Sequence, residues 1–147
     1  MPESVEFIKS WEDFEPEPYE DGISMSIGYG QRVRGRTHIT KAQATKELTW
    51  HIKTIQDVIH KEFTGLNANQ MTALTSIYYN VAGFPELKKV IHERNFERIS
   101  RLWIRYCRVR MYDIYGNPIL NEKGEHKKKT LLGLQKRRTA ERNLFME

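Results

Sequence analysis

Cysteine is nearly absent from this sequence, since Cys107 is the only one among 147 residues. A disulfide needs two cysteines, so no intramolecular bridge can form and the fold must depend on its hydrophobic core. This usage is typical of synthesis in a reducing compartment. The first residues contain neither a basic segment nor an apolar run, and no later window approaches the ~20 apolar residues of a membrane span. We therefore expect no export signal and no stable membrane insertion.

Sequence patterns for metals and nucleotides are also missing. The histidines are scattered, without the close spacing of paired metal ligands. Neither of two glycine-rich phosphate patterns, Gly-x-x-x-x-Gly-Lys and Gly-x-Gly-x-x-Gly, occurs between a strand and a helix. We therefore expect no metal site and no cofactor. The histidines are His38, His51, His60, His92 and His126.

Charge is abundant but unevenly distributed. The formal net charge is +5 and the pI is about 9.3. Residues 1–31 hold eight acids and one base, whereas residues 98–142 hold thirteen bases and four acids. A length of 147 residues suits one compact domain, and its basic half favours an anionic partner or substrate.

Hydrophobic periodicity predicts a mainly helical chain. A short N-terminal helix runs from Ser4 toward Phe14 and stops before two prolines. The long helix over 40–60 has Thr40 as its N-cap, and the next helix is capped at Asn67 or Asn69. Short strands are expected within 19–38, and a hairpin-like excursion over 112–132. Further helices are predicted over 85–93, 96–107 and 134–145. Five aromatic residues have helical spacings typical of core and cleft lining, and the core is favoured for most of them. They are Trp50, Tyr78, Tyr79, Trp103 and Tyr106.

Two carboxylates near the N-terminus suggest acid–base chemistry. Glu12 follows Trp11 at the end of an apolar helical face, where partial burial would raise its pKa and keep it protonated near neutrality. Asp21 lies on a turn beside the hydroxyl of Ser26 and can stay ionised. One protonated and one ionised carboxyl group are what glycosidic cleavage uses.

Three segments together resemble the phage-type lysozymes, glycoside hydrolase family 24. They occur in the family's order and extend over about 130 residues. The first holds Ile8, Lys9, Trp11, Glu12, Phe14, Tyr19 and Asp21, then Ser26, Ile27, Gly28, Tyr29 and Gly30. The second holds Leu66, Asn67, Asn69, Gln70, Leu74, Asn80, Val81 and Gly83. The third holds Gly133, Leu134, Arg137, Arg138, Glu141, Leu144 and Phe145.

The resemblance implies an α+β, lysozyme-like fold in a single domain, 1–147. A small lobe, about residues 14–60 with a β-hairpin or sheet over 19–38, would join a helical lobe, about 1–13 and 67–147, through a long helix. A cleft between the lobes would hold the site. Arg137 and Arg138 are predicted to form a structural pair that contacts carboxylates near the hinge, with phosphate recognition as the alternative.

The resemblance assigns the catalytic roles to Glu12 as general acid, Asp21 as the carboxylate that orients water, and Ser26 as its assisting hydroxyl. It implies an endolysin, a muramidase that hydrolyses the β-1,4 bond between N-acetylmuramic acid and N-acetylglucosamine in bacterial peptidoglycan, with inversion. We expect a monomer that stays in the host cytoplasm until holin-type release to the wall. Residues that bind the substrate are not identified.

Four departures from the family pattern lie near this site. Serine replaces threonine at Ser26, and four residues instead of five separate it from Asp21. Asp13 stands where the family has glycine, and Gln31 where it has histidine. These changes leave open a catalytically impaired lysozyme-like domain that binds glycan or protein. A nucleic-acid module is the other alternative, because lysine runs neutralise phosphates, but no nucleic-acid motif accompanies them and we expect no such partner.

Overall fold

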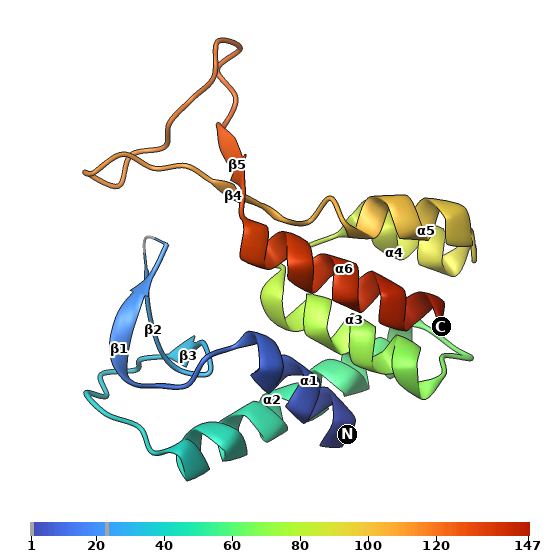
Figure 1. The fold of residues 1–147 in the computed structure, drawn as a ribbon, viewed down its shortest axis with the longest axis horizontal. Coiled ribbons are helices and arrows are strands. Elements are labelled where there is room, and N and C mark those ends of the chain that lie inside the picture. Colours follow the sequence, from blue (N-terminus) through green and yellow to red (C-terminus); the bar gives the residue numbers. More distant parts are fainter. Residues whose placement is uncertain (1, 23) are drawn as a thin grey trace.

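The computed structural model describes residues 2–22 and 24–147, and its architecture is α+β and mainly helical, as predicted (Figure 1). A small sheet lies on one side of the molecule, and the helices pack together on the other. Among the described residues, no helix has the length and apolar character needed to cross a membrane. The helices are α1 (Pro2–Trp11), α2 (Lys41–Glu62), α3 (Ala68–Asn80), α4 (Pro85–His92), α5 (Phe96–Trp103) and α6 (Leu132–Met146).

The strands form two antiparallel sheets. The first has the order β1–β2–β3, and its β1–β2 register places Tyr19 opposite Ser26 and Asp21 opposite Ser24. The second joins β4 and β5. The strands are β1 (Glu15–Asp21), β2 (Ser24–Gly28), β3 (Gln31–Arg32), β4 (Arg108–Arg110) and β5 (Lys128–Thr130).

The start of the sheet differs from the prediction. α1 ends at Trp11 instead of continuing toward Phe14, and β1 begins at Glu15 instead of near residue 19. β1 is an edge strand, where prolines are tolerated because one row of backbone groups needs no partner strand. Pro16 therefore lies within the strand, and its carbonyl accepts a hydrogen bond from the Ile39 N–H at 2.9 Å. Phe14 leaves the helix and packs against the Tyr29 ring, with the centroids 5.4 Å apart.

The N-terminal caps of α2 and α3 follow the sequence closely. Thr40 caps α2 through a reciprocal pair of hydrogen bonds with Gln43. Asn67, one of the two predicted candidates, caps α3 in the same way with Gln70. Such capping boxes satisfy backbone donors that the helix itself leaves unpaired.

The hydrophobic core consists of two clusters. The larger one lies among α2–α6, and the smaller one joins α1, the sheet and the first half of α2. Tyr79 packs against both. The smaller cluster contains Val5, Ile8, Ile27, Tyr29, Ile39, Ala44, Leu48 and Ile52.

A buried polar contact fixes α1 against the helices. The Ser4 and Thr72 hydroxyls are 3.2 Å apart, and the Gln56 amide donates to Ser4 at 3.0 Å. Buried polar groups are stable only when they are hydrogen-bonded. This contact therefore sets the position of α1, and with it the position of Glu12 at the end of α1.

Two other sequence predictions need correction. Trp50 was expected in the core but is 70% exposed, because α2 buries Leu48 and Ile52 and so turns Trp50 to the opposite face. α5 ends at Trp103 instead of residue 107, since the chain tightens into a turn in which the Arg105 N–H donates to the Leu102 carbonyl.

Candidate active site

A cleft of about 860 Å³ lies between the sheet and the helical part of the molecule. It contains two of the three predicted catalytic residues, Glu12 and Asp21. We call the sheet side of the cleft the sheet wall, which consists of Glu15, Tyr19, Asp21 and Gly30. The opposite side, the helical wall, consists of Trp11, Glu12, Asp13, Tyr79, Asn80, Leu131, Leu132, Gly133, Leu134 and Arg137.

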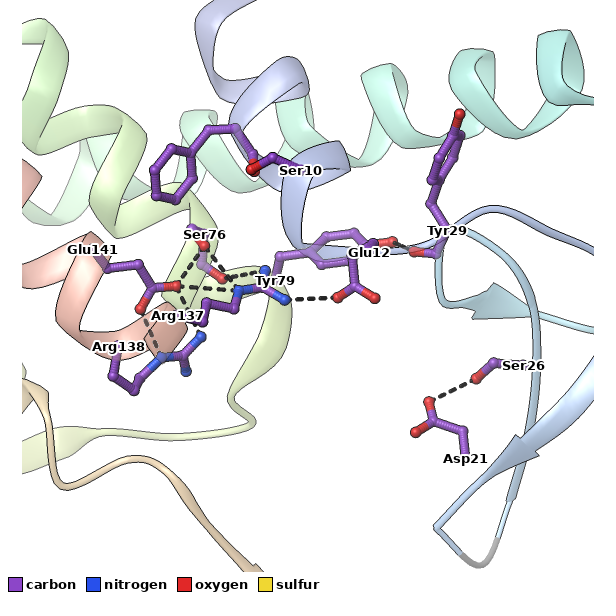
Figure 2. Close-up of polar contacts among 11 residues, drawn as sticks. Ser10, Glu12, Asp21, Ser26, Tyr29, Ser76, Tyr79, Arg137, Arg138 and Glu141 are labelled. Atoms are coloured by element: carbon purple, nitrogen blue, oxygen red, sulfur yellow. Dashed lines mark hydrogen bonds and ion pairs between the residues drawn. The ribbon is translucent and has the colours of Figure 1, made fainter. Parts of the chain in front are cut away.

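Glu12 is the first residue after α1, where its backbone N–H still donates to the Ile8 carbonyl. Its side chain is 19% exposed, and Oε1 accepts a hydrogen bond from Nη1 of Arg137 at 2.8 Å (Figure 2). Oε2 lies on the side of Gly30, where an added Cβ would approach it to 3.2 Å. The carboxyl group is therefore held on one side by α6 and limited on the other by the glycine turn.

Burial raises the pKa of Glu12 above its usual value. The hydrogen bond and positive charge of Arg137 oppose this shift, while the negative charge of Asp21 adds to it. Burial outweighs the ion pair because removal of a carboxylate from water is expensive. Glu12 can therefore hold its proton at a higher pH than an exposed glutamate can, as a general acid must.

Arg137 is held in place by groups on two helices. Nε donates to the Ser76 hydroxyl at 3.2 Å, and Nη2 reaches the Ser76 carbonyl at 3.4 Å. Nε also lies 3.4 Å from the Glu141 carboxylate, one turn further along α6. The guanidinium is 4% exposed, so it has little freedom to leave Glu12.

Glu141 is a fully buried carboxylate at the centre of this network. It accepts a hydrogen bond from the Trp103 indole at 3.0 Å. It also accepts from Arg138 Nη2 at 2.8 Å and from the Ser76 hydroxyl (Figure 2). Arg138 is fully buried too, and its Nε lies 2.7 Å from Glu141. The prediction that Arg137 and Arg138 form a pair that contacts carboxylates is confirmed.

In this network, burial shifts the pKa values of Glu141 and Arg138 toward the uncharged forms. Burial raises the pKa of Glu141, although both arginines, Ser76 and Trp103 oppose the shift. Burial also lowers the pKa of Arg138 to about 10, against the attraction of Glu141. Each charge is therefore stable in the interior only because its partner is present.

Asp21 lies at the end of β1, and Ser26 lies on the neighbouring strand. The Ser26 hydroxyl donates to Oδ2 of Asp21 at 2.9 Å. Ser26 is directly opposite Tyr19 in the ladder, and Tyr19 lies two residues before Asp21 on β1. The side chains of Ser26 and Asp21 therefore project from the same face of the sheet. The hydroxyl reaches the carboxylate even though the connection is one residue shorter than the family pattern. Asp21 is exposed and Ser26 is buried.

The glycine turn beside Glu12 is fixed by the side chains of Gln31 and Tyr79. Gln31 accepts from the Tyr29 N–H at 2.6 Å and donates to the Ala44 carbonyl on α2 at 2.7 Å. The Tyr79 hydroxyl of α3 donates to the Tyr29 carbonyl at 2.6 Å. Gly30 has a φ of +81°, which glycine adopts without strain. Gln31 therefore anchors the turn at the position where the family pattern has histidine.

Several cleft residues were not found by the sequence reasoning. Tyr19 lies on the sheet wall, and its pKa is raised by burial and by the charges of Asp21 and Glu12. Tyr79, for which both core and cleft positions were open, packs against the core and also lines the cleft, and burial followed by the charge of Glu12 raises its pKa. Residues 131–134 complete the helical wall. The i,i+2 spacing of Tyr19 and Asp21 on a strand was the available signal for the first of these.

Solved structures with similar folds are lysozyme-like proteins. The muramidase domain of SpmX from Asticaccaulis excentricus has a TM-score of 0.77 and 20% identity, covering 100% of this chain and 97% of that one. An endolysin from Escherichia coli O157:H7 phage FAHEc1 has a TM-score of 0.76 and 25% identity, covering 100% and 92%. A mutant of P22 lysozyme has a TM-score of 0.67 and 19% identity, covering 100% and 97%. No curated protein sequence matches this one significantly.

Sequence comparison with family profiles gives the assignment directly. The profile described as phage lysozyme matches residues 9–141, which is most of the chain. The matched region contains the cleft carboxylates, Ser26 and the arginine pair of α6. The family-level resemblance and the lysozyme-like fold predicted from the sequence are both confirmed. The chain belongs to the phage lysozyme family of glycoside hydrolases.

Proposed function

We propose that this protein is an active muramidase that hydrolyses the β-1,4 bond between N-acetylmuramic acid and N-acetylglucosamine in peptidoglycan. The observation that carries the proposal is the contrast between two carboxyl groups in one cleft. Glu12 is largely buried with a raised pKa, whereas Asp21 is exposed and accepts a hydrogen bond from Ser26. Carboxyl groups in such unlike environments serve as acid and base in glycosidases.

In this mechanism Glu12 protonates the leaving glycosidic oxygen, and Asp21 orients a water on the opposite face of the sugar. Ser26 holds Asp21 through its donated hydrogen bond and so fixes the carboxylate toward the cleft. As the glycosidic C–O bond breaks, the water oxygen bonds to the anomeric carbon and its proton passes to Asp21. Direct attack by water inverts the anomeric configuration, which requires the two carboxyl groups to lie roughly 6.5–9.5 Å apart.

The departures from the family pattern are compatible with activity. Ser26 keeps the hydroxyl contact to Asp21, and Gln31 holds the glycine turn. Asp13 lies on the cleft surface and is exposed. These contacts favour an active enzyme over the alternative, a catalytically impaired domain that binds glycan or protein.

The biological setting that we propose is host-cell lysis by a phage or prophage. A phage endolysin is among the proteins with the same fold, and the chain belongs to the phage lysozyme family, whose substrate is peptidoglycan of the cell wall. The enzyme acts as a monomer, collects in the host cytoplasm, and reaches the wall after a holin or an equivalent opens the membrane. Expression in a host with and without a holin, followed by measurement of lysis, tests this step.

The decisive experiment measures clearing of purified peptidoglycan by the wild type, Glu12→Gln and Asp21→Asn. We expect each substitution to lower turnover by about 10²–10⁴-fold, the usual contribution of a positioned acid or base. Glu15→Gln is the matched control, because Glu15 is an exposed carboxylate on the same cleft, and it should keep near-wild-type activity. The products should carry new reducing ends on N-acetylmuramic acid, and NMR of the first product should show the inverted anomer.

The result that would reject the proposal is equally defined. If the folded wild-type protein clears no peptidoglycan from several wall types at any pH, the protein is a lysozyme-like binding domain. If it clears the wall but Glu12→Gln is equally active, the role of Glu12 is wrong.

A further inference from the structure

Residues 108–130, which lie in the connection between α5 and α6, form an arm that projects away from the helices (Figure 1). β4 and β5 pair at its base and connect it to the start of α6. It carries none of the residues that line the cleft. The arm therefore has no part in the mechanism proposed above, and its composition needs another explanation.

Hydrogen bonds within the arm give it a defined conformation. The Asp113 carboxylate accepts from the N–H groups of Tyr115 and Asn117, each at 2.9 Å. The Asn121 side-chain carbonyl accepts in the same way from the backbone N–H groups of Lys123 at 2.9 Å and Glu125 at 3.0 Å. These bonds fix two successive turns. Side chains on the turns are consequently displayed in set positions.

The first of these turns displays large apolar side chains to solvent. Ile114 is 91% exposed and its neighbour Tyr115 is 82% exposed. Leu120, between the two turns, is 54% exposed. Single exposed apolar residues are ordinary on protein surfaces, but adjacent ones on a preorganised projecting turn indicate a contact with an apolar phase.

The base of the arm concentrates positive charge. Arg110 and Lys128 are directly opposite each other in the β4–β5 ladder, although like charges in this position destabilise a sheet. Lys128 and Arg108, together with Arg105 of the preceding turn, line a hollow of about 620 Å³. Within 2–22 and 24–147, no cation of the arm takes part in an ion pair. This concentration of positive charge suits an anion from outside the chain.

We propose that the arm binds the surface of an anionic lipid bilayer. The cations of the base contact lipid phosphates, and Ile114 and Tyr115 enter the boundary between headgroups and acyl chains. Tyrosine prefers this boundary, and basic residues beside apolar ones are typical of proteins that lie on anionic membranes. Nucleic acids and wall polymers supply anions but offer no apolar phase for Ile114, so the lipid surface accounts for both features.

The experiment measures sedimentation of the purified protein with two kinds of vesicle. One kind contains phosphatidylcholine alone, and the other contains phosphatidylcholine mixed with phosphatidylglycerol. The wild type should bind the mixed vesicles and show little binding to the neutral ones. Higher salt should weaken binding, because it screens the cations from the lipid phosphates.

Two variants separate the contributions of the arm. The first variant replaces three consecutive exposed lysines at the base of the arm, Lys127→Gln, Lys128→Gln and Lys129→Gln. It should weaken binding to mixed vesicles by about 100-fold, since each cation near an anionic surface contributes about fivefold. The double variant Ile114→Asn, Tyr115→Ser should weaken it by about tenfold or more, because the apolar contact is lost. Both should keep wild-type wall clearing, which shows that they fold and separates this test from that of the proposed function.

Matched controls come from α2, whose outer face is also exposed. Trp50→Ser removes an aromatic side chain that is 70% exposed, and Lys46→Gln, Lys53→Gln and Lys61→Gln together remove the same charge as the arm variant. Each should bind mixed vesicles within about twofold of the wild type if the arm is the site.

Three outcomes would overturn the proposal. The first is absence of wild-type binding to the mixed vesicles, and the second is equal loss of binding in the α2 controls and the arm variants. The third is a turn variant, Ile114→Asn, Tyr115→Ser, that binds as the wild type does while the lysine variant does not. That result, with similar lysine-dependent binding to a random DNA duplex, would identify the arm as a general polyanion contact.

Discussion

On the helical wall of the cleft, Glu12 is largely buried and pairs with Arg137, whereas on the sheet wall Asp21 is exposed and meets the hydroxyl of Ser26. The two side chains have nearly the same chemistry. Burial raises the pKa of Glu12, while water remains available to Asp21. The comparison teaches that the position in the fold, more than the residue type, decides whether a carboxyl group is buried and its pKa raised.

The two walls also differ in what supports them. The helical wall rests on a network of buried charges that joins Arg137, Arg138 and Glu141 to Ser76 and Trp103. The sheet wall rests on a three-stranded sheet whose edge is exposed. Substitutions in the network should therefore affect folding, while substitution of the exposed Asp21 on the sheet wall should mainly affect turnover.

The largest expected effect comes from Glu141→Gln, which removes the negative charge from the helical wall. It leaves the fully buried Arg138 without its anion, and loss of one partner of a buried pair costs about 3–5 kcal/mol. The free energy of unfolding should fall by that amount in urea denaturation. Glu122→Gln, at an exposed site on the arm, should change it by less than about 0.5 kcal/mol. Equal stability of the two variants would contradict the support assigned to the network.

A smaller effect is expected from Gly30→Ala, at the point where the walls meet. The φ of +81° disfavours a side chain by about 1–2 kcal/mol, and the new Cβ would also lie 3.2 Å from the Glu12 carboxyl group. Gly35→Ala is the control, with a φ of +74° and open space around the Cβ position. Both variants should lose similar stability in thermal unfolding, but only Gly30→Ala should also lose wall-clearing activity at temperatures where it is folded. Similar activity in the two variants would show that a Cβ so close to the Glu12 carboxyl group does not affect catalysis.

The smallest expected effect on catalysis is a shift in pH dependence when Arg137→Gln removes the cation from Glu12, beside the loss of stability that any substitution in the buried network brings. Arg137 lowers the pKa of Glu12, while burial and Asp21 raise it, so loss of Arg137 should raise the pKa further. Since the general acid works when protonated, activity declines as the pH rises through the pKa of Glu12. The alkaline limb of the pH profile should therefore move to higher pH. Movement to lower pH would mean that Arg137 does not stabilise the ionised form.

Much of the fold followed from local signals. Helix starts with a side-chain cap, such as Thr40, were predicted because the capping residue and its partner are close in sequence. The exposure of Trp50 was also available from the sequence, although the prediction overlooked it. Trp50 lies two residues from both Leu48 and Ile52, about 200° around the helix from each. The end of α5 at Trp103 could not be predicted from the local sequence pattern, because it depends on where the arm begins.

The candidate site was predicted in part. Glu12, Asp21 and Ser26 could be named because they lie within one short motif, and the structure brings Asp21 and Ser26 into hydrogen-bond contact. The contact between Glu12 and Arg137 joins residues far apart in sequence, so periodicity gave no indication of it. The pairing of Ser76 with Glu141 was hidden for the same reason. These contacts arise from packing of α6 against α3 and against the residue that follows α1, which local patterns do not specify.

The separation of Glu12 from Arg137 by 125 residues has a consequence for the timing of synthesis. At about 5–20 residues per second, the ribosome adds Arg137 about 6–25 s after Glu12. The cleft thus gains the last part of its helical wall only when α6 has been made and docked. A chain that is released early lacks this whole part of the wall together with Arg137, so unfinished products should remain harmless to the wall of the cell that makes them.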